Sequence, residues 1–279
     1  MTPKEFSGSV GDIQRAAISS WIDGGAQVIL LGDETGTHEA ARELGAGHVP
    51  RVPLTASGVP TVAGLIATIV QEAEHPVRGL VNADIVLVSD IAPVISDVQR
   101  ALPAGTPWLG VARRTNLPWH LIETEPPESL ERTARSSGRL HPASGCDVFL
   151  FGADPWPTIP PLAIGRTFWD AWLIWAAHQH GSLIVDLTPS LLTLHPDEDR
   201  DRGSLESIWF SSEAADNQRA THRRGRTVLE ADRVLLDGRV RHWSASPAHL
   251  LGRIPSRLVR SSLRASPGLR RALLRRRWR

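Results

Sequence analysis

The sequence predicts an α/β fold, in which a mainly parallel β-sheet carries helices on both faces. Between residues 10 and 195, short apolar runs typical of buried strands alternate with segments whose apolar residues recur at helical spacing. Glycines and capping residues mark the ends of several helical segments. Strands separated by helical stretches favour parallel pairing, because the chain crosses back before the next strand begins.

The first part of this region predicts three helices and one strand. In the first helix, Val10, Ile13, Ala17 and Trp21 recur at helical spacing. The helices are expected over 10–23, ended by Gly24 and Gly25, over 37–44, capped by Thr37 and closed by Gly45, and over 61–74; the strand is expected over 27–31.

The second part predicts four strands and two more helices. The strands are expected over 79–88, 107–112, 147–151 and 183–187; one helix follows a cap at Ser89 or Asp90, and the other covers 167–181 and stops at Gly181. In sheets of this kind, ligands bind beyond the carboxyl ends of the strands, where the stretches GDETG (32–36) and NAD (82–84) lie.

Asn82 and Asp84 interrupt an otherwise apolar run, RGLVNADIVLVSD (78–90). In a strand, their side chains would share one face, opposite Val81 and Ala83. A carboxylate in such surroundings is costly unless a charged or hydrogen-bonding group meets it. The partner is either structural, such as an arginine or a helix N-terminus, or it is a metal ion or a ligand.

The composition is that of an ordinary soluble globular protein in a reducing compartment. The 279 residues are 41% hydrophobic and 22% charged, and the single cysteine, Cys146, excludes an internal disulfide. The N-terminus lacks the apolar region of a secretory signal, and apolar runs such as AWLIWAA (171–177) are too short to span a bilayer. We therefore expect a cytoplasmic protein.

Basic charge is concentrated at the C-terminus. Residues 253–279 hold ten arginines and no Asp or Glu, so the rest of the chain has 21 of the 31 basic residues against 30 acidic ones. Leucines and Trp278 interleave with these arginines, which suits an anionic membrane surface at the inner face of the plasma membrane. A disordered solubilising tail is the first alternative, and contact with nucleic acid ranks last.

We expect two parts in the chain. Residues 1–245 form one domain, in which 196–245 are a peripheral extension because the apolar periodicity weakens there. Residues 246–279 form an Arg-rich amphipathic or disordered tail.

Several familiar nucleotide-binding and catalytic motifs are missing. The sequence has no GxxxxGK[ST], and its only lysine is Lys4, which excludes a P-loop nucleotidase. No GxGxxG follows a strand, so a dinucleotide-binding domain is not expected, and GxSxG, HExxH and paired CxxC are absent as well.

Three segments resemble bacterial family-2-like glycosyltransferases of the GT-A fold: FSGSVGDIQRAAISSW (6–21), VNADIVLVSD (81–90) and HPASGCDVFLF…PPLAIGRTFWDAWLIW (141–175). More narrowly, they are similar to an uncharacterised branch with an I-Q-R-x-A-I-x-S-W helix and a V-N-A-D-I strand. The resemblance covers roughly residues 3–200. It implies a GT-A-like domain that moves a sugar from a nucleotide-diphosphate donor to a saccharide or lipid-linked acceptor, with Mg²⁺ or Mn²⁺ and in an inverting reaction.

The resemblance assigns the donor site to Asn82 and Asp84. In the family an Asp-x-Asp element holds the nucleotide-sugar, with its first acid at the ribose and its second at a cation on the diphosphate. Asn82 can still hydrogen-bond a ribose hydroxyl, and Asp84 offers the oxygen ligand that Mg²⁺ or Mn²⁺ prefers. Asp33 matches a family acid near the base or ribose, and its alternative is an ordinary turn residue.

Asp170 is the expected catalytic base. The apolar stretch FWDAWLIWAA surrounds this acid, so burial is expected to raise its pKa toward neutrality and let it take a proton from an acceptor hydroxyl. The resemblance places the family's base in this neighbourhood. The alternative is a buried Asp that is bonded to Arg166 or to backbone amides.

Three further residues are candidates. His195 is comparable to a metal-ligating His of many GT-A enzymes, and a solvated or structural His is the alternative. Asp147 is at a position where the fold meets the transferred sugar. Trp156, in the Pro-rich loop ADPWPTIPP, is the tryptophan best placed to stack on a sugar ring.

Two other functions compete with a transferase. A GT-A-like domain without turnover would bind a saccharide or nucleotide as a scaffold, and Asn82 in place of an acid favours this alternative. A nucleic-acid-associated protein would act through its Arg-rich tail. Nucleotide binding with and without a divalent metal is the most informative single experiment, because it tests whether a donor site exists.

Overall fold

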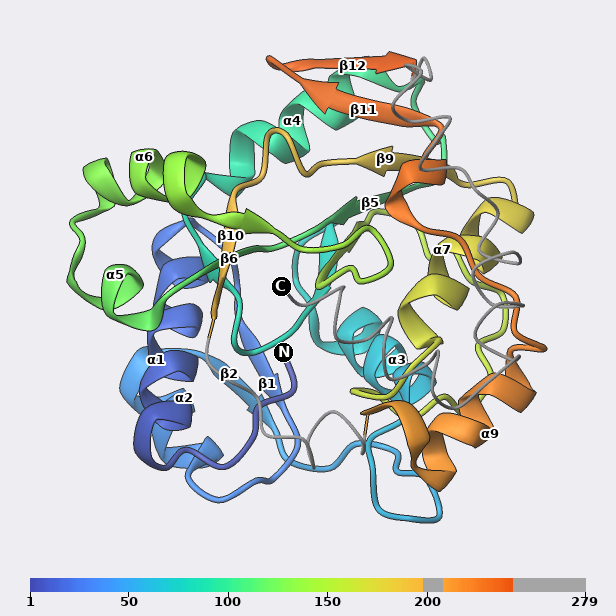
Figure 1. The fold of residues 1–279 in the computed structure, drawn as a ribbon. Helices are drawn as coiled ribbons and strands as arrows, with labels where there is room; N and C mark the ends of the chain where they lie inside the picture. The colour runs from blue at the N-terminus through green and yellow to red at the C-terminus, as the bar shows by residue number, and fades with distance from the viewer. Residues whose placement is uncertain (198–207, 243–279) are drawn as a thin grey trace, which may run out of the picture. The chain divides into compact units, whose positions relative to one another are not determined.

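The computed structural model describes residues 1–197 and 208–242 (Figure 1). These residues belong to one unit, Met1–His242. The expected tail over 246–279, with its membrane contact, lies outside the described residues. Within the described part, no helix has both the length and the apolar character that a membrane span requires.

The central sheet has six strands in the order β12-β11-β9-β5-β8-β3 (Figure 1). Alternate residues of β3 and β8 point to opposite faces, and both faces are buried: Leu80 and Phe149 belong to one apolar cluster, whereas Val81 and Leu150 belong to another. The strands are β3 (Arg78–Val81), β5 (Trp108–Ala112), β8 (Val148–Phe151), β9 (Leu183–Asp186), β11 (Arg233–Leu236) and β12 (Arg239–His242).

The α/β class is confirmed, and the pairing of this sheet is mixed. Strand β9 pairs in parallel with β5 and with β11, while β8 is antiparallel to both β3 and β5, and β12 is antiparallel to β11. The reason lies in the excursion over 113–147. The chain leaves β5 and enters β8 at the same edge of the sheet, so β8 must run back along β5.

A second sheet has the order β4-β10-β6-β7, and a separate parallel pair joins β1 to β2. The predicted strand 79–88 is therefore two strands that belong to different sheets, with a turn at 83–84 between them. The expectation that Asn82 and Asp84 share one face of a single strand is thus wrong. The strands are β1 (Ile29–Leu31), β2 (Gly47–Val49), β4 (Val86–Leu87), β6 (Thr115–Leu117), β7 (Arg139–Leu140) and β10 (Thr193–Pro196).

Helices cover both faces of the central sheet. Helices α3 and α7 pack on the face of Leu109 and Phe151, and α1 and α4 pack on the face of Ala112 and Val185. The helices are α1 (Gly8–Asp23), α2 (Thr37–Leu44), α3 (Val62–Glu72), α4 (Ile91–Ala101), α5 (Trp119–Thr124), α6 (Pro127–Ser137), α7 (Trp169–Gln179), α9 (Ser212–Ala220) and the 3₁₀ turn η1 (Val228–Glu230).

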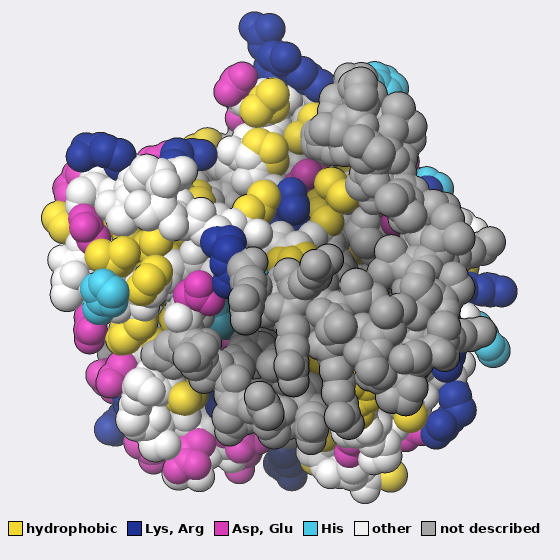
Figure 2. Space-filling model, viewed as in Figure 1, with side chains coloured by type: hydrophobic (Ala, Val, Ile, Leu, Met, Phe, Trp, Pro, Cys, Tyr) yellow, Lys and Arg dark blue, Asp and Glu magenta, His cyan; other side chains and the backbone are white. Residues whose placement is uncertain are grey.

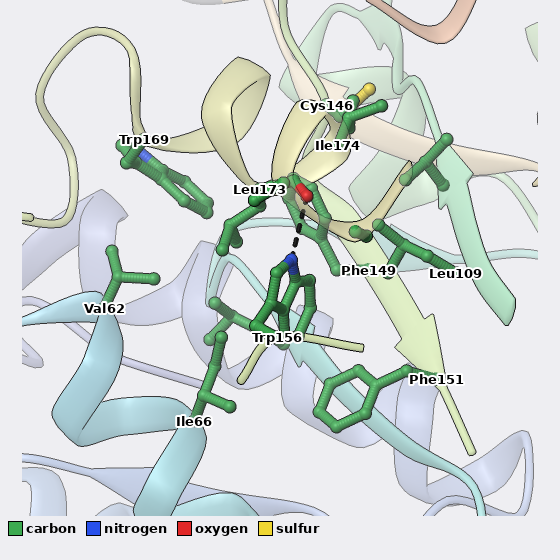
Figure 3. Packing of buried hydrophobic residues seen from close by; sticks show 14 of the residues in the cluster. Val62, Ile66, Leu109, Cys146, Phe149, Phe151, Trp156, Trp169, Leu173 and Ile174 are labelled. Atoms are coloured by element: carbon green, nitrogen blue, oxygen red, sulfur yellow. Dashed lines mark hydrogen bonds between the residues drawn. The ribbon is translucent and has the colours of Figure 1, made fainter. Parts of the chain in front are cut away.

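The apolar cluster between α3, α7 and the sheet encloses Trp156 (Figure 3). Its indole Nε1 donates a 2.8 Å hydrogen bond to the carbonyl of Leu173 in α7. The ring of Phe151 meets it edge-on at 5.2 Å between centroids. Trp156 thus ties the loop after β8 to α7, which begins beside the candidate site.

Candidate active site at one edge of the central sheet

The candidate site lies at the edge where β3, β5 and β9 end and β8 begins. Register places Val81 and Ala112 on either side of Val148, the first residue of β8. The residues just beyond these positions, Asn82 and Asp147, are joined through the backbone N–H of Asn82 and the carbonyl of Asp147 at 3.3 Å. The arrangement follows the rule that α/β sheets hold ligands beyond the carboxyl ends of their strands.

A buried ion pair joins Arg114 to Asp147. Nη1 of Arg114 lies 2.5 Å from Oδ1 of Asp147, and the two side chains are 10% and 5% exposed. The amide Nδ2 of Asn82 donates to the same Oδ1 at 2.9 Å. Nε of Arg114 donates to Oδ1 of Asn116 in β6 at 3.1 Å. The other oxygen of Asp147, Oδ2, is buried and has no hydrogen-bond partner among the described residues.

Asp84 faces His195 of β10. Oδ2 of Asp84 lies 3.4 Å from Nε2 of His195, and the side chains are 24% and 10% exposed, in that order. Oδ1 of Asp84 is buried without a hydrogen-bond partner in the described part of the chain. The pairing arises because β10 lies antiparallel to β4, which begins two residues after Asp84. An imidazole, and not an arginine, therefore meets this carboxylate.

The pKa of Asp84 lies well below its ordinary value. Burial would raise it, but the hydrogen bond with His195 and the charges of His195, Lys4 and Arg114 together outweigh burial. The site therefore holds Asp84 as a carboxylate with one oxygen left over. Such an oxygen is suited to a cation or to a hydroxyl donor.

Asp170 lies in the first turn of α7 and has its pKa raised to about 6. Burial is the main cause, and the negative charge of Asp147 adds to it, while backbone N–H groups of Ala171 and Cys146 bond the carboxylate and act against the rise. Phe168, two residues before Asp170, has a left-handed backbone with a φ of 78°. Asp170 is thus half-buried with its pKa moved toward neutrality, and its hydrogen bonds to backbone amides are those that the structural alternative predicted.

Four acidic or sulfur groups converge at this edge. Burial raises the pKa of the Cys146 thiol, and the negative charges of Asp170, Asp147 and Asp186 raise it further. Asp186, at the end of β9, is 2% exposed and accepts a hydrogen bond from the backbone N–H of Thr188 at 2.9 Å. All three acids therefore lie close enough to Cys146 to raise the pKa of its thiol.

Two candidates stand apart from this group. Asp33 is exposed in the loop after β1 and makes no hydrogen bond or ion pair with the other candidates among the described residues. Trp156 is 3% exposed inside the core and packs its indole against Phe151. The prediction that Trp156 stacks on a sugar ring is wrong for this structure, because the apolar cluster covers its ring.

Three residues of the site were not predicted from the sequence: Arg114, Asn116 and Lys4. The available signal for Arg114 was its place directly after a buried strand, where the dipeptide Arg113–Arg114 follows PWLGVA. Asn116 carried no signal, since a lone Asn in a short strand has no distinctive spacing. Lys4 acts on Asp84 through its charge, and nothing in the sequence places it there.

Asp84 and His195 provide two of the ligands that a hard or borderline divalent cation requires. Asp84 offers a buried oxygen and His195 a ring nitrogen, the donor types that suit Mn²⁺. Within the described residues, no group of three or more His, Cys, Asp or Glu is arranged to hold a metal ion. A cation at this pair would therefore need further oxygens, which a diphosphate can provide.

Comparisons with known proteins give one distant structural likeness. No family model matches the chain, and no curated protein matches it. Among solved structures, the crystal structure of a glucosyl-3-phosphoglycerate synthase from M. tuberculosis aligns with a TM-score of 0.43 and 13% identity, over 90% of this chain and 99% of that chain. A similarity at this level carries no conclusion about function.

Proposed function

We propose that the chain is a glycosyltransferase that moves a sugar from a nucleotide-diphosphate donor to a hydroxyl of a saccharide or lipid-linked acceptor, with inversion. The observation that carries the proposal is the meeting of Asn82, Asp84, Asp147, Asp170 and His195 at one edge of the sheet. The sequence resemblance to GT-A transferases, given above, is the second support. Both point to donor binding and proton transfer in one place.

Asp84 and His195 would hold a divalent cation, Mg²⁺ or Mn²⁺. Such a cation, when bound, would neutralise the charge that develops on the departing nucleoside diphosphate. Asp84 suits this role because its pKa is lowered, so it is ionised at any physiological pH. Asn82 would hydrogen-bond the nucleoside, and Asp33, exposed in the loop after β1, would contact its base or ribose.

Asp170 would act as the base. With a pKa of about 6 it is ionised at neutral pH, yet it is a stronger base than an ordinary Asp. In a direct displacement, Asp170 would accept the proton of the acceptor hydroxyl while the acceptor oxygen forms its bond to the sugar carbon and the diphosphate oxygen leaves. The backbone N–H groups of Ala171 and Cys146 would hold the carboxylate in one orientation.

A thermal shift series tests the donor site. UDP, GDP, CDP and TDP are each added with and without Mn²⁺ to the wild-type chain, to Asp84→Ala and to a control, Glu131→Ala, whose carboxylate is 53% exposed on α6. We expect a Mn²⁺-dependent rise in Tm with one nucleotide, kept in the control and lost in Asp84→Ala. No rise with any nucleotide, or a rise that Asp84→Ala keeps, would contradict the proposal.

A scaffold that binds without turnover is the second candidate, favoured by Asn82 in place of an acid. It gives the same thermal shift as a transferase, so the two are separated by release of the free nucleoside diphosphate from a donor. Loss of that release in Asp170→Asn, with nucleotide binding retained, is expected of a transferase. A wild-type chain that binds a donor but never releases the diphosphate in the presence of saccharide and lipid-linked acceptors is the scaffold.

We also propose that residues 253–279 bind an anionic membrane surface. The support is compositional: ten arginines, interleaved leucines and no acidic residue. On the face shown in Figure 2, basic and acidic side chains are interspersed over the described residues. By sequence, residues 253–279 differ from this pattern, because they hold basic residues and no acidic ones. Flotation with anionic and neutral liposomes, with and without 253–279, tests this, and equal flotation on anionic lipid would exclude it.

A further inference from the structure

A chain of buried polar side chains runs behind the candidate site. It passes from Asn116 through Arg114 and Asp147 to Asn82, with distances of 3.1, 2.5 and 2.9 Å between the bonded atoms. Asn116, Arg114 and Asp147 are 5%, 8% and 4% exposed. Buried networks of this kind hold their members in single orientations, because a broken link leaves a polar group without a partner.

The ion pair determines which way the Asn82 amide points. A carboxylate that is paired with a guanidinium can only accept hydrogen bonds, so the amide nitrogen of Asn82, and not its oxygen, must face Asp147. The carbonyl Oδ1 of Asn82 is then turned away from Asp147, and no described residue donates to it. An aspartate at position 82 would instead bring its own carboxylate against that of Asp147.

The consequence is a set of three acceptor oxygens on neighbouring side chains. Asn82 Oδ1, Asp147 Oδ2 and Asp84 Oδ1 are all oxygens that accept hydrogen bonds, and the last two are buried without a partner among the described residues. A ligand that meets Asn82 Oδ1 must offer a hydrogen-bond donor there. We infer that Arg114 is a positioning residue that, through Asp147, orients Asn82 to accept from hydroxyl groups of a polyol ligand, which the proposed function identifies as the donor's ribose or sugar.

The inference rests on the proposed function for its ligand, so the first test uses nucleotides. Wild-type chain is titrated calorimetrically, in Mn²⁺, with UDP, GDP and CDP and with the 2′-deoxy and 3′-deoxy analogue of each. We expect one ribonucleotide to bind about tenfold tighter than a deoxy analogue, the loss expected for one hydrogen bond to a buried acceptor.

Substitutions at Arg114 then decide the matter. Without the guanidinium, nothing fixes the orientation of the Asp147 carboxylate, so the Asn82 amide is free to turn over. Arg114→Met should bind the ribonucleotide and its deoxy analogue with equal affinity, and Arg114→Lys should recover part of the wild-type difference in affinity. The control is Arg135→Ala, which removes an exposed ion pair on α6 and should keep the full difference. A folded Arg114→Met that keeps the wild-type ratio, or a wild type that binds both forms equally, overturns the inference.

A second test needs no ligand and applies also if Arg114→Met does not fold. Asn82→Asp sets two carboxylates face to face, and we expect its Tm to fall by at least about 5 °C near neutral pH. Adding Asp147→Asn should restore part of the loss, because the new amide at position 147 can donate to the new carboxylate at position 82. An Asn82→Asp chain as stable as wild type overturns the inference, while a wild type that binds no nucleotide contradicts only the proposed function.

Discussion

The carboxylate of Asp84 faces the imidazole of His195, with 3.4 Å between Oδ2 and Nε2. The guanidinium of Arg114, whose charge also acts on Asp84, forms its ion pair with Asp147 instead. This division of partners matters because a bidentate arginine would have filled both oxygens of Asp84. Instead, one buried oxygen of Asp84 has no partner among the described residues, and the pair can still accept a ligand.

Replacing Asp84 by Asn is expected to lower the free energy of unfolding by about 1–3 kcal/mol near neutral pH. Because the folded chain lowers the pKa of Asp84, this contribution is present above the ordinary value of 3.8 and is lost as the pH falls below it. Urea unfolding of both chains at a series of pH values gives the difference. It should shrink toward acid, and a difference that stays constant or grows would contradict the pairing.

Asp170→Asn is expected to stabilise the chain at neutral pH. A pKa raised from 3.8 to about 6 means that the folded state resists ionisation, so the wild type loses stability as the pH rises from about 4 to about 6. The variant lacks this ionisable group, and it should gain up to about 3 kcal/mol above that range and nothing at the acid end. Urea unfolding across this range measures the gain.

The activity of the same variant should move in the opposite direction. Where turnover is found, wild-type kcat is expected to fall below about pH 6 as Asp170 takes up a proton. Asp170→Asn should lose at least about a hundredfold in kcat. A variant that is more stable and equally active would leave Asp170 as a structural acid and contradict its role as the base.

Removing one member of the Arg114–Asp147 pair should be costly. Arg114→Ala leaves a carboxylate that is 5% exposed without its cation, and we expect a loss of about 3–5 kcal/mol in the free energy of unfolding. The control is Arg135→Ala, whose pair with Glu131 is more than half exposed on both sides, with an expected change below about 0.5 kcal/mol. Equal losses of unfolding free energy in Arg114→Ala and Arg135→Ala would show that the buried pair stabilises the fold no more than the exposed one.

Local sequence patterns were enough to predict a helix and the environment of one site residue. Apolar spacing was enough for α1, where Ile13, Ala17 and Trp21 are buried, although Val10 of the same pattern is 39% exposed near the first turn. The pattern failed there because the first turn of a helix extends past the core that it packs against. For Asp170, the apolar neighbours predicted partial burial and a pKa moved toward neutrality, and the structure has both.

The partners within the site could not be predicted in the same way. Arg114 meets Asp147 only because β8 runs antiparallel to β5, a register that brings together two segments on either side of a long excursion. Likewise, the run 79–88 is uniformly apolar except for Asn82 and Asp84, so its pattern does not reveal the turn that divides β3 from β4. Pairing between distant segments decides both points, and local spacing carries no information about it.

The burial of Trp156 leads to a last prediction about stability and binding. Trp156→Phe removes the hydrogen bond to the Leu173 carbonyl and leaves a small void in the core, so the free energy of unfolding should fall by about 1–3 kcal/mol. Nucleotide affinity should stay within about twofold, because the core covers the indole. Trp209→Phe, at a side chain that is 39% exposed, is the control and should change stability by less than about 0.5 kcal/mol. A Trp156→Phe chain with wild-type stability but weakened binding of donor or acceptor would show that Trp156 contacts the ligand, and it would contradict a role in the core.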